Sequence, residues 1–258
     1  MPPYVLIEKR EGQTPLQALD ELRIARPELA GVSLTYAGRL DPMASGKLLV
    51  LIGEECKNRA KYLGLDKEYE FEVLLGVESD TGDILGIPSL MTGADSYSEA
   101  EVHTAVLSLI GEHSLPYPVY SSRTVNGKPL FHYAHNGGLG EVTVPTTDMI
   151  VHEGFVRSIK TLSHQAVIRS IIRRIEQFNP VVNPMLIGSD FRKDLIVAKW
   201  KELESSAQGT VTIISCSVRV SSGTYIRTLA PMIAQLLGTK GLAHSIHRTK
   251  IHIPLTQK

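Results

Sequence analysis

The sequence is short of several features that would point to particular protein classes. It has only two cysteines, Cys56 and Cys216, far apart and in no Cys-x-x-Cys pair. This excludes a disulfide framework and a cysteine zinc site, and it favours a reducing cytoplasm. No apolar run approaches the length of a membrane-spanning helix, and the first residues lack the basic start and long apolar stretch of a signal peptide. We therefore expect a cytoplasmic protein without a membrane-spanning segment.

Net charge is also missing, because 27 Lys and Arg residues balance 27 Asp and Glu residues. Taken alone, a neutral chain argues against a nucleic-acid partner. The charges are segregated, however. The stretch 73–122 holds no Lys or Arg, whereas the stretch 154–175 holds no acid but contains Arg157, Lys160, Arg169, Arg173 and Arg174. The pattern is compatible with ordinary solvated faces and equally with a surface for a polyanion.

The length of 258 residues suits one large domain, or a main domain with a small appendage, and the 43% of hydrophobic residues allow a core to be buried. Thr14 with Gln17, and Ser98 with Glu101, are capping boxes that predict helix starts. Leu16, Leu19 and Leu22 are expected on the buried side of the first helix. Further helices are expected over 163–178, over 190–203, and from Gly223 toward Gly238 with a kink or restart at Pro231. The helix after Ser98 is expected to end at a Gly111 cap.

Strands are predicted where apolar residues alternate or β-branched residues gather. They cover Tyr4–Lys9, Lys67–Leu75 and Thr210–Val220, and the middle strand places Tyr69, Phe71, Val73 and Leu75 on one face. The segment Gly31–Gly46 is predicted to be a loop. Strands mixed with helices, without strict alternation, indicate an α+β or mixed α/β domain.

A carboxylate with a special setting lies in the segment 36–46, Tyr-Ala-Gly-Arg-Leu-Asp-Pro-Met-Ala-Ser-Gly. A phosphate-binding loop is excluded, because Leu48 follows Gly46-Lys47 where such loops have Ser or Thr. Asp41 before Pro42 is compatible with a plain turn, since proline pushes the preceding residue to an extended backbone.

This segment resembles the catalytic loop of the TruB family of tRNA pseudouridine synthases, whose pattern is Gly-x-Leu-Asp-Pro-x-Ala-x-Gly. The matching positions are Gly38, Leu40, Asp41, Pro42, Ala44 and Gly46. Three further family motifs follow in the family's order. They are similar to Lys67-Glu68-Tyr69 with Gly76, Asp80, Thr81, Asp83 and Gly86; to Tyr120-Ser121-Ser122 with 127–134; and to Ser222-Gly223-Thr224-Tyr225-Ile226-Arg227. The resemblance spans Tyr4 to Ile251 and is thin between Glu141 and Ala207.

The resemblance implies the pseudouridine synthase fold, a mixed and largely antiparallel sheet with helices around a central cleft. It also implies cofactor-free isomerisation of uridine 55 in the T-loop of tRNA. Asp41 would be the nucleophile or base, Arg227 its bidentate salt-bridge partner, and Tyr69 a ring that stacks on the base. Tyr225 and Ile246 would line the base pocket.

Some positions depart from the family pattern. Tyr36 stands where the family has a histidine that helps to hold the opened RNA, and the chain leaves no room for the PUA domain that many relatives append. The expected domain is therefore 1–258, a catalytic domain alone. Two other functions stay open: a pseudouridine synthase acting on a different RNA site, and a non-catalytic RNA-binding or RNA-folding protein on the same scaffold.

The expected partner is the tRNA T-arm, bound by a monomer. Arg39, Lys128, Arg248 and Lys250 are candidates for phosphate contacts. His244, His247 and His252 have no Cys or acidic residue at a ligand spacing, so no metal is expected.

Overall fold

A computed structural model describes residues 1–90, 97–181 and 188–254. The centre is an eight-stranded sheet in which all pairs are antiparallel except β3 with β12. Its strands, in spatial order, are β1 (Tyr4–Lys9), β3 (Ala44–Ile52), β12 (Gly241–Ile251), β4 (Lys67–Leu75), β11 (Thr210–Val220), β10 (Thr146–Ser163) and β7 (Gly111–Pro116), with β2 (Leu34–Ala37) paired to β3. The expected mixed, largely antiparallel α+β fold is confirmed.

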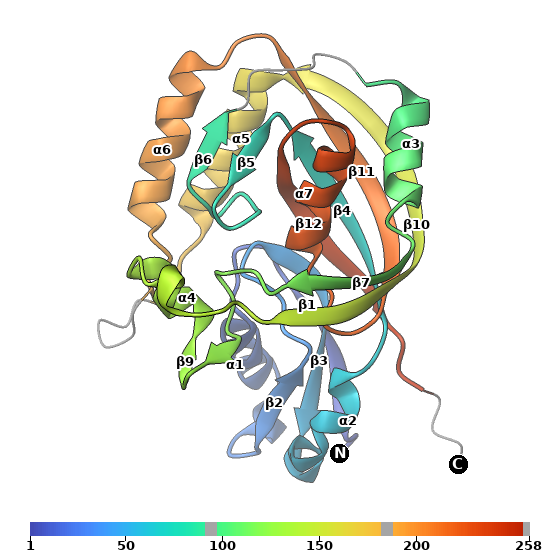
Figure 1. The fold of residues 1–258 in the computed structure, drawn as a ribbon. Coiled ribbons are helices and arrows are strands. Elements are labelled where there is room, and N and C mark those ends of the chain that lie inside the picture. Colours follow the sequence, from blue (N-terminus) through green and yellow to red (C-terminus); the bar gives the residue numbers. More distant parts are fainter. Residues whose placement is uncertain (91–96, 182–187, 255–258) are drawn as a thin grey trace.

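Helices and short strands surround this sheet (Figure 1). The helices are α1 (Pro15–Ala25), α2 (Ala60–Leu63), α3 (Glu99–Leu107), α4 (Leu130–His135), α5 (His164–Gln177), α6 (Lys193–Ser206) and α7 (Ile226–Leu236). The short pairs are β5 (Val77–Ser79) with β6 (Pro88–Leu90), and β8 (Thr124–Val125) with β9 (Lys128–Pro129).

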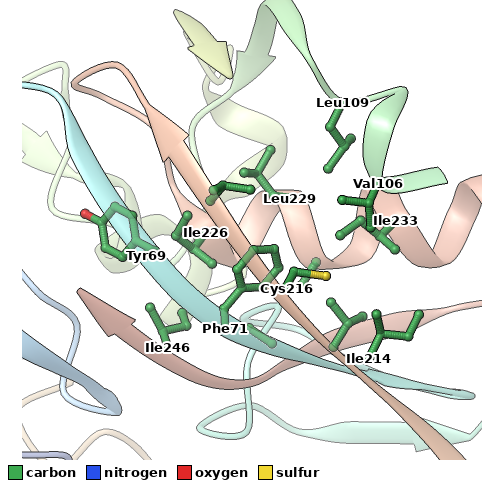
Figure 2. Close-up of a cluster of buried hydrophobic side chains, with 14 of the residues drawn as sticks. Tyr69, Phe71, Val106, Leu109, Ile214, Cys216, Ile226, Leu229, Ile233 and Ile246 are labelled. Atoms are coloured by element: carbon green, nitrogen blue, oxygen red, sulfur yellow. The ribbon is translucent and has the colours of Figure 1, made fainter. Parts of the chain in front are cut away.

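Successive residues of a strand point to opposite faces of the sheet. The central strands carry apolar side chains on both faces, and helices cover both. On one face Phe71 and Val73 of β4 pack with Val106 of α3 and Ile233 of α7 (Figure 2). On the other face Leu74 and Ile213 pack with the apolar residues of α5 and α6. Figure 1 shows α5 and α6 together on one flank of the molecule and α3 on the other. Tyr69 and Ile246 lie at one end of the first cluster.

Locally determined elements match the sequence predictions. The strands Tyr4–Lys9, Lys67–Leu75 and Thr210–Val220 have the predicted bounds. Both capping boxes are present, with Thr14 and Ser98 as N-caps. Ser163 caps α5, which covers most of the predicted helix 163–178 and buries its apolar side, including Val167, Ile168 and Ile171. α6 begins three residues later than predicted and extends to Ser206.

Other predictions were wrong. The segment Gly31–Gly46 is a loop only in part, since it contains β2, which pairs with residues 49–52 of β3, and the first residues of β3 itself. Leu16 is exposed, because a three-residue spacing drifts by about 60° per step around a helix and Ala18 completes the buried side instead. The helix after Ser98 ends at Leu107, and Gly111 begins β7. α7 continues through Pro231, so the predicted restart of the helix there does not occur.

Strand β10 was not predicted at all. Its pairing with β11 shifts register between Val151 and Glu153 and again between Val156 and Ser158. Each bulge changes which face the following side chains point to, so the period-two alternation of a strand is lost in this stretch.

Candidate active site

The loop 38–43 joins β2 to β3 and carries Asp41. β3 begins directly after it, at Ala44, and is flanked there by β1 on one side and by β12 on the other. Gly46 faces the backbone of Arg248 so closely that a Cβ would lie 2.3 Å from the Arg248 carbonyl oxygen. Only glycine permits this approach, which anchors the end of the loop in the sheet.

Two buried basic side chains hold the backbone of this loop. The Lys9 Nζ donates to the carbonyls of Pro42 at 3.1 Å and Ala44 at 2.5 Å. Arg248 donates to the carbonyls of Gly38 at 2.9 Å and Lys47 at 2.6 Å. Both side chains are fully buried, so their charges are desolvated. Burial lowers the pKa of Lys9 to about 7, although Asp41 opposes the shift.

Asp41 and Arg227 form an ion pair across 186 positions of sequence. The Arg227 Nε donates to Asp41 Oδ2 at 2.6 Å. The predicted bidentate bridge is wrong, because the other two nitrogens donate to backbone carbonyls, Nη1 to Thr81 at 2.9 Å and Nη2 to Tyr120 at 3.3 Å. The Arg227 side chain is 4% exposed and that of Asp41 29%. The arginine is therefore fixed from behind, and the carboxylate faces outward.

A second carboxylate, Asp83, lies behind this pair. Its Oδ2 is 3.6 Å from the Arg227 Nε, and its Oδ1 accepts from the Thr81 hydroxyl at 2.7 Å and the Leu85 amide at 2.9 Å. Burial raises the pKa of Asp83, while Arg227 opposes this. For Arg227 burial disfavours the charge, but Asp41 and Asp83 prevail and raise its pKa. Asp83 belongs to one of the motifs that resemble the family, but it was not predicted as a site residue. Its contact with Arg227 places it in the site.

Asp41 opens into a cavity of about 820 Å³. Most predicted site residues line it: Tyr36, Arg39, Asp41, Tyr69, Tyr225, Arg227, Ile246 and Arg248. The Tyr225 ring packs edge-on against Tyr117 at 5.9 Å between centroids, and Arg123 lies 4.9 Å over the Tyr117 ring. Burial raises the pKa of Tyr225, and Asp41 adds to this. The cavity thus combines a carboxylate with aromatic and apolar walls, a setting suited to a planar ring.

Residues 28–171, more than half of the chain, match the family described as TruB family pseudouridylate synthase (N terminal domain). The chain belongs to the TruB family.

Individual TruB relatives cover different shares of the chain. A protein named tRNA pseudouridine synthase B from Aromatoleum aromaticum is 34% identical over 58% of this chain and 49% of its own length. One of the same name from Xanthomonas euvesicatoria is 29% identical over 91% of this chain and 74% of its own. The chain therefore spans between half and three quarters of the length of these relatives. The fold is also similar to a chain in the crystal structure of a Cbf5-Nop10-Gar1 complex, with a TM-score of 0.56 at 15% identity over 96% of this chain and 48% of that one.

Two predicted RNA contacts of this TruB protein, Lys128 and Arg248, are poorly placed to reach a phosphate at the cavity. Lys128, on β9, is exposed and is not among the residues that line the cavity. Arg248 is fully buried, with its guanidinium directed to backbone carbonyls and, at 3.4 Å, to the Tyr69 hydroxyl. A phosphate contact by Arg248 therefore does not fit the structure. Arg39 is exposed at the cavity, where its Nη2 donates to the Tyr36 hydroxyl at 3.3 Å.

The basic stretch 154–175 is largely neutralised by pairing. Arg157 lies 3.5 Å from Glu70, Arg169 2.6 Å from Glu204 and Arg174 2.7 Å from Glu11. These acids come from other elements, which sequence order does not reveal. Three of the five basic side chains of this stretch are therefore paired with acids of other elements.

No group of three or more metal-ligating side chains occurs within 1–90, 97–181 and 188–254. His244 contacts Glu72 at 2.9 Å, and His252 contacts Glu68 at 2.7 Å. Among the residues that the structure describes, no helix is long and apolar enough to cross a membrane.

Proposed function

We propose that this protein is a pseudouridine synthase that isomerises uridine 55 in the T-loop of tRNA. The observation that carries the proposal is the Asp41–Arg227 pair at the cavity, within a chain of the TruB family. The relatives cited above bear the name tRNA pseudouridine synthase B, which supports tRNA as the substrate.

The reaction breaks the N1–C1′ bond of the uridine and joins C5 to C1′. C5 loses a proton and N1 gains one, so no oxidant, water or cofactor is consumed. Asp41 supplies the carboxylate, acting on C1′ as a nucleophile or removing a proton at C2′. Arg227 holds and orients this carboxylate, because its Nε donates to one oxygen and leaves the other for the sugar.

The target base must leave its stack to reach Asp41. The cavity offers Tyr69 as a stacking surface, Ile246 as an apolar wall and Tyr225 as a further ring. Tyr36 can stack on an unpaired base at the rim, although it cannot become cationic as histidine can. Arg39, at the cavity, and Lys128, away from it, are exposed cations for RNA phosphates.

The proposed partner is the T-arm stem–loop of tRNA, bound by a monomer. The substrate and the unpaired cysteines suit the cytoplasm.

The decisive experiment compares Asp41→Asn with the wild type on a T-arm stem–loop. The variant keeps the side-chain shape but loses the ionised oxygen, so pseudouridine formation should vanish while RNA binding stays within a few-fold. Asp20→Asn is the matched control, since Asp20 is exposed on α1 and does not line the cavity. An active Asp41→Asn variant would refute the mechanism, and a wild type without turnover would favour a non-catalytic RNA-binding role.

A different RNA site is the second candidate, and Tyr36 favours it because this position departs from the family's histidine. Mapping pseudouridines in the total RNA of host cells with and without the protein separates the two. An unmodified T-loop together with a lost signal elsewhere would select the second candidate.

A further inference from the structure

The α5–α6 hairpin reaches the cavity through the segment that precedes α6. Gly188, Phe191 and Arg192 line the cavity there. The family match ends at residue 171, within α5, so this segment lies outside the matched residues. Phe191 and Arg192 both have φ of 55°. That left-handed conformation costs a residue other than glycine about 1–2 kcal/mol. Two successive residues of this kind persist only where the surrounding contacts hold them.

Arg192 contributes an ion pair and a ring contact to holding this segment. Its Nη1 donates to Asp80 Oδ2 at 2.6 Å and its Nη2 to Asp80 Oδ1 at 3.3 Å, a two-pronged ion pair. The same guanidinium lies over the Tyr120 ring, with its carbon 4.2 Å from the centroid. Its side chain is only 14% exposed. One side chain therefore joins the β5–β6 connection, which carries Asp80, to the β7–β8 connection, which carries Tyr120.

These two connections are also the ones that hold Arg227 from behind. Thr81, next to Asp80, supplies the carbonyl for Nη1, and Tyr120 itself supplies the carbonyl for Nη2. A shift of either connection would move a carbonyl that orients Arg227. Since the Arg227 Nε donates to Asp41, such a shift would reach the carboxylate as well.

We propose that Arg192 is a positioning residue, which keeps the Thr81 and Tyr120 carbonyls in place so that Arg227 presents Asp41 to the substrate. The inference rests on the proposed function, because it concerns the orientation of that carboxylate. Arginine suits this task better than lysine, since only a planar guanidinium can bind a carboxylate with two prongs and stack on a ring at once. The Asp80 carboxylate already neutralises this guanidinium, and the Arg192 side chain is only 14% exposed, which together argue against a direct phosphate contact.

The test uses Arg192→Met and Arg192→Lys in the full-length chain. Under single-turnover conditions at saturating T-arm RNA, both should lower the rate about 10-fold, or ~1.4 kcal/mol, with the half-saturating RNA concentration changed less than about twofold. Arg169→Met is the control, because Arg169 makes an ion pair of the same length, 2.6 Å, with Glu204 in the same hairpin without lining the cavity. If Arg192→Met does not fold, Arg192→Lys decides.

A double-mutant cycle adds specificity. Asp80→Asn should reproduce the rate loss, and its combination with Arg192→Met should cost less than about twofold more, because both remove one contact. Fully additive losses would contradict the shared role. A rise in half-saturation with an unchanged rate would identify Arg192 as an RNA contact instead, and would overturn the proposal.

A readout without turnover separates this inference from the proposed function. In an NMR spectrum of the Arg Nε–H groups, the Arg227 signal, assigned with Arg227→Lys, should shift or broaden in Arg192→Met but not in Arg169→Met. An inactive wild type would reject the proposed function, but the Arg227 signal would still test whether Arg192 positions Arg227. An unmoved Arg227 signal would overturn the proposal whatever the enzyme's activity.

Discussion

Gly82 lies against the backbone carbonyl of Arg227, and a Cβ at Gly82 would be 2.7 Å from that oxygen. Pro231 stands four residues after Arg227 and has no N–H, so the helix provides no i+4 amide donor for this carbonyl. The close approach of the β5–β6 connection to α7 thus occurs where the helix backbone is open. This places Thr81 beside the Arg227 guanidinium, and the Thr81 carbonyl accepts a hydrogen bond from Nη1.

Gly82→Ala should therefore disturb the site as well as the fold. The left-handed φ of 76° costs alanine about 1–2 kcal/mol, and the clash pushes the connection away from Arg227. We expect a lower melting temperature and a pseudouridine formation rate reduced about 10-fold, or ~1.4 kcal/mol. Gly76→Ala is the matched control, because Gly76 has a φ of 81° but no neighbour within 4 Å of the added Cβ. Equal activity losses in both variants would mean that the contact with Arg227 has no effect.

The buried amine of Lys9 makes stability depend on pH in a defined direction. Burial lowers its pKa from 10.5 to about 7 in the folded protein. The unfolded chain therefore binds more protons between pH 7 and pH 10.5, so the Lys9 contribution to the free energy of unfolding rises with pH across that window. The contribution is lost as the pH falls through 7, where the buried amine becomes charged.

Urea unfolding of the wild type and of Lys9→Met at pH 6.5, 8 and 9.5 measures this effect. The wild type should gain stability relative to the variant as the pH rises, by up to about 1.4 kcal/mol per pH unit. Lys47→Met removes an exposed lysine paired with Glu8 and should give a nearly constant difference. If the free energy of unfolding of the wild type minus that of Lys9→Met stays constant or falls as the pH rises, the amine is not desolvated.

Arg39 and Arg248 should respond differently to salt although both line the cavity. Arg39→Gln removes an exposed cation, so we expect the slope of log Kd against log salt for T-arm RNA to fall by about 1. Arg248→Met should leave the slope unchanged and cost roughly 1–3 kcal/mol of unfolding free energy, because four acceptor groups around it lose their donor. Nitrocellulose filter binding at several salt concentrations, together with urea unfolding, checks both. A reduced slope for Arg248→Met would restore its original assignment as a phosphate contact.

Features that depend on near neighbours in the chain were accessible without coordinates. The capping boxes at Thr14 and Ser98 act within three residues. The alternation in Lys67–Leu75 reflects the two faces of one strand. The Asp41 loop was accessible for another reason, namely that its motif resembles a family pattern. The limits appear in β10, where two bulges erase the alternation, and at Leu16, where side-chain spacing did not decide burial.

Relations between distant segments required the folded chain. The sequence motifs identify Asp41, Tyr69 and Arg227. Only packing brings their further neighbours together, namely Asp83 behind the pair, the carbonyls of Thr81 and Tyr120, and Arg192 from the α5–α6 hairpin. Packing also decided that Arg248 lies under the loop and that the basic stretch is paired with acids from other elements. Local rules act over one helical turn or one strand pair, whereas the charge environment of a side chain depends on every segment that surrounds it.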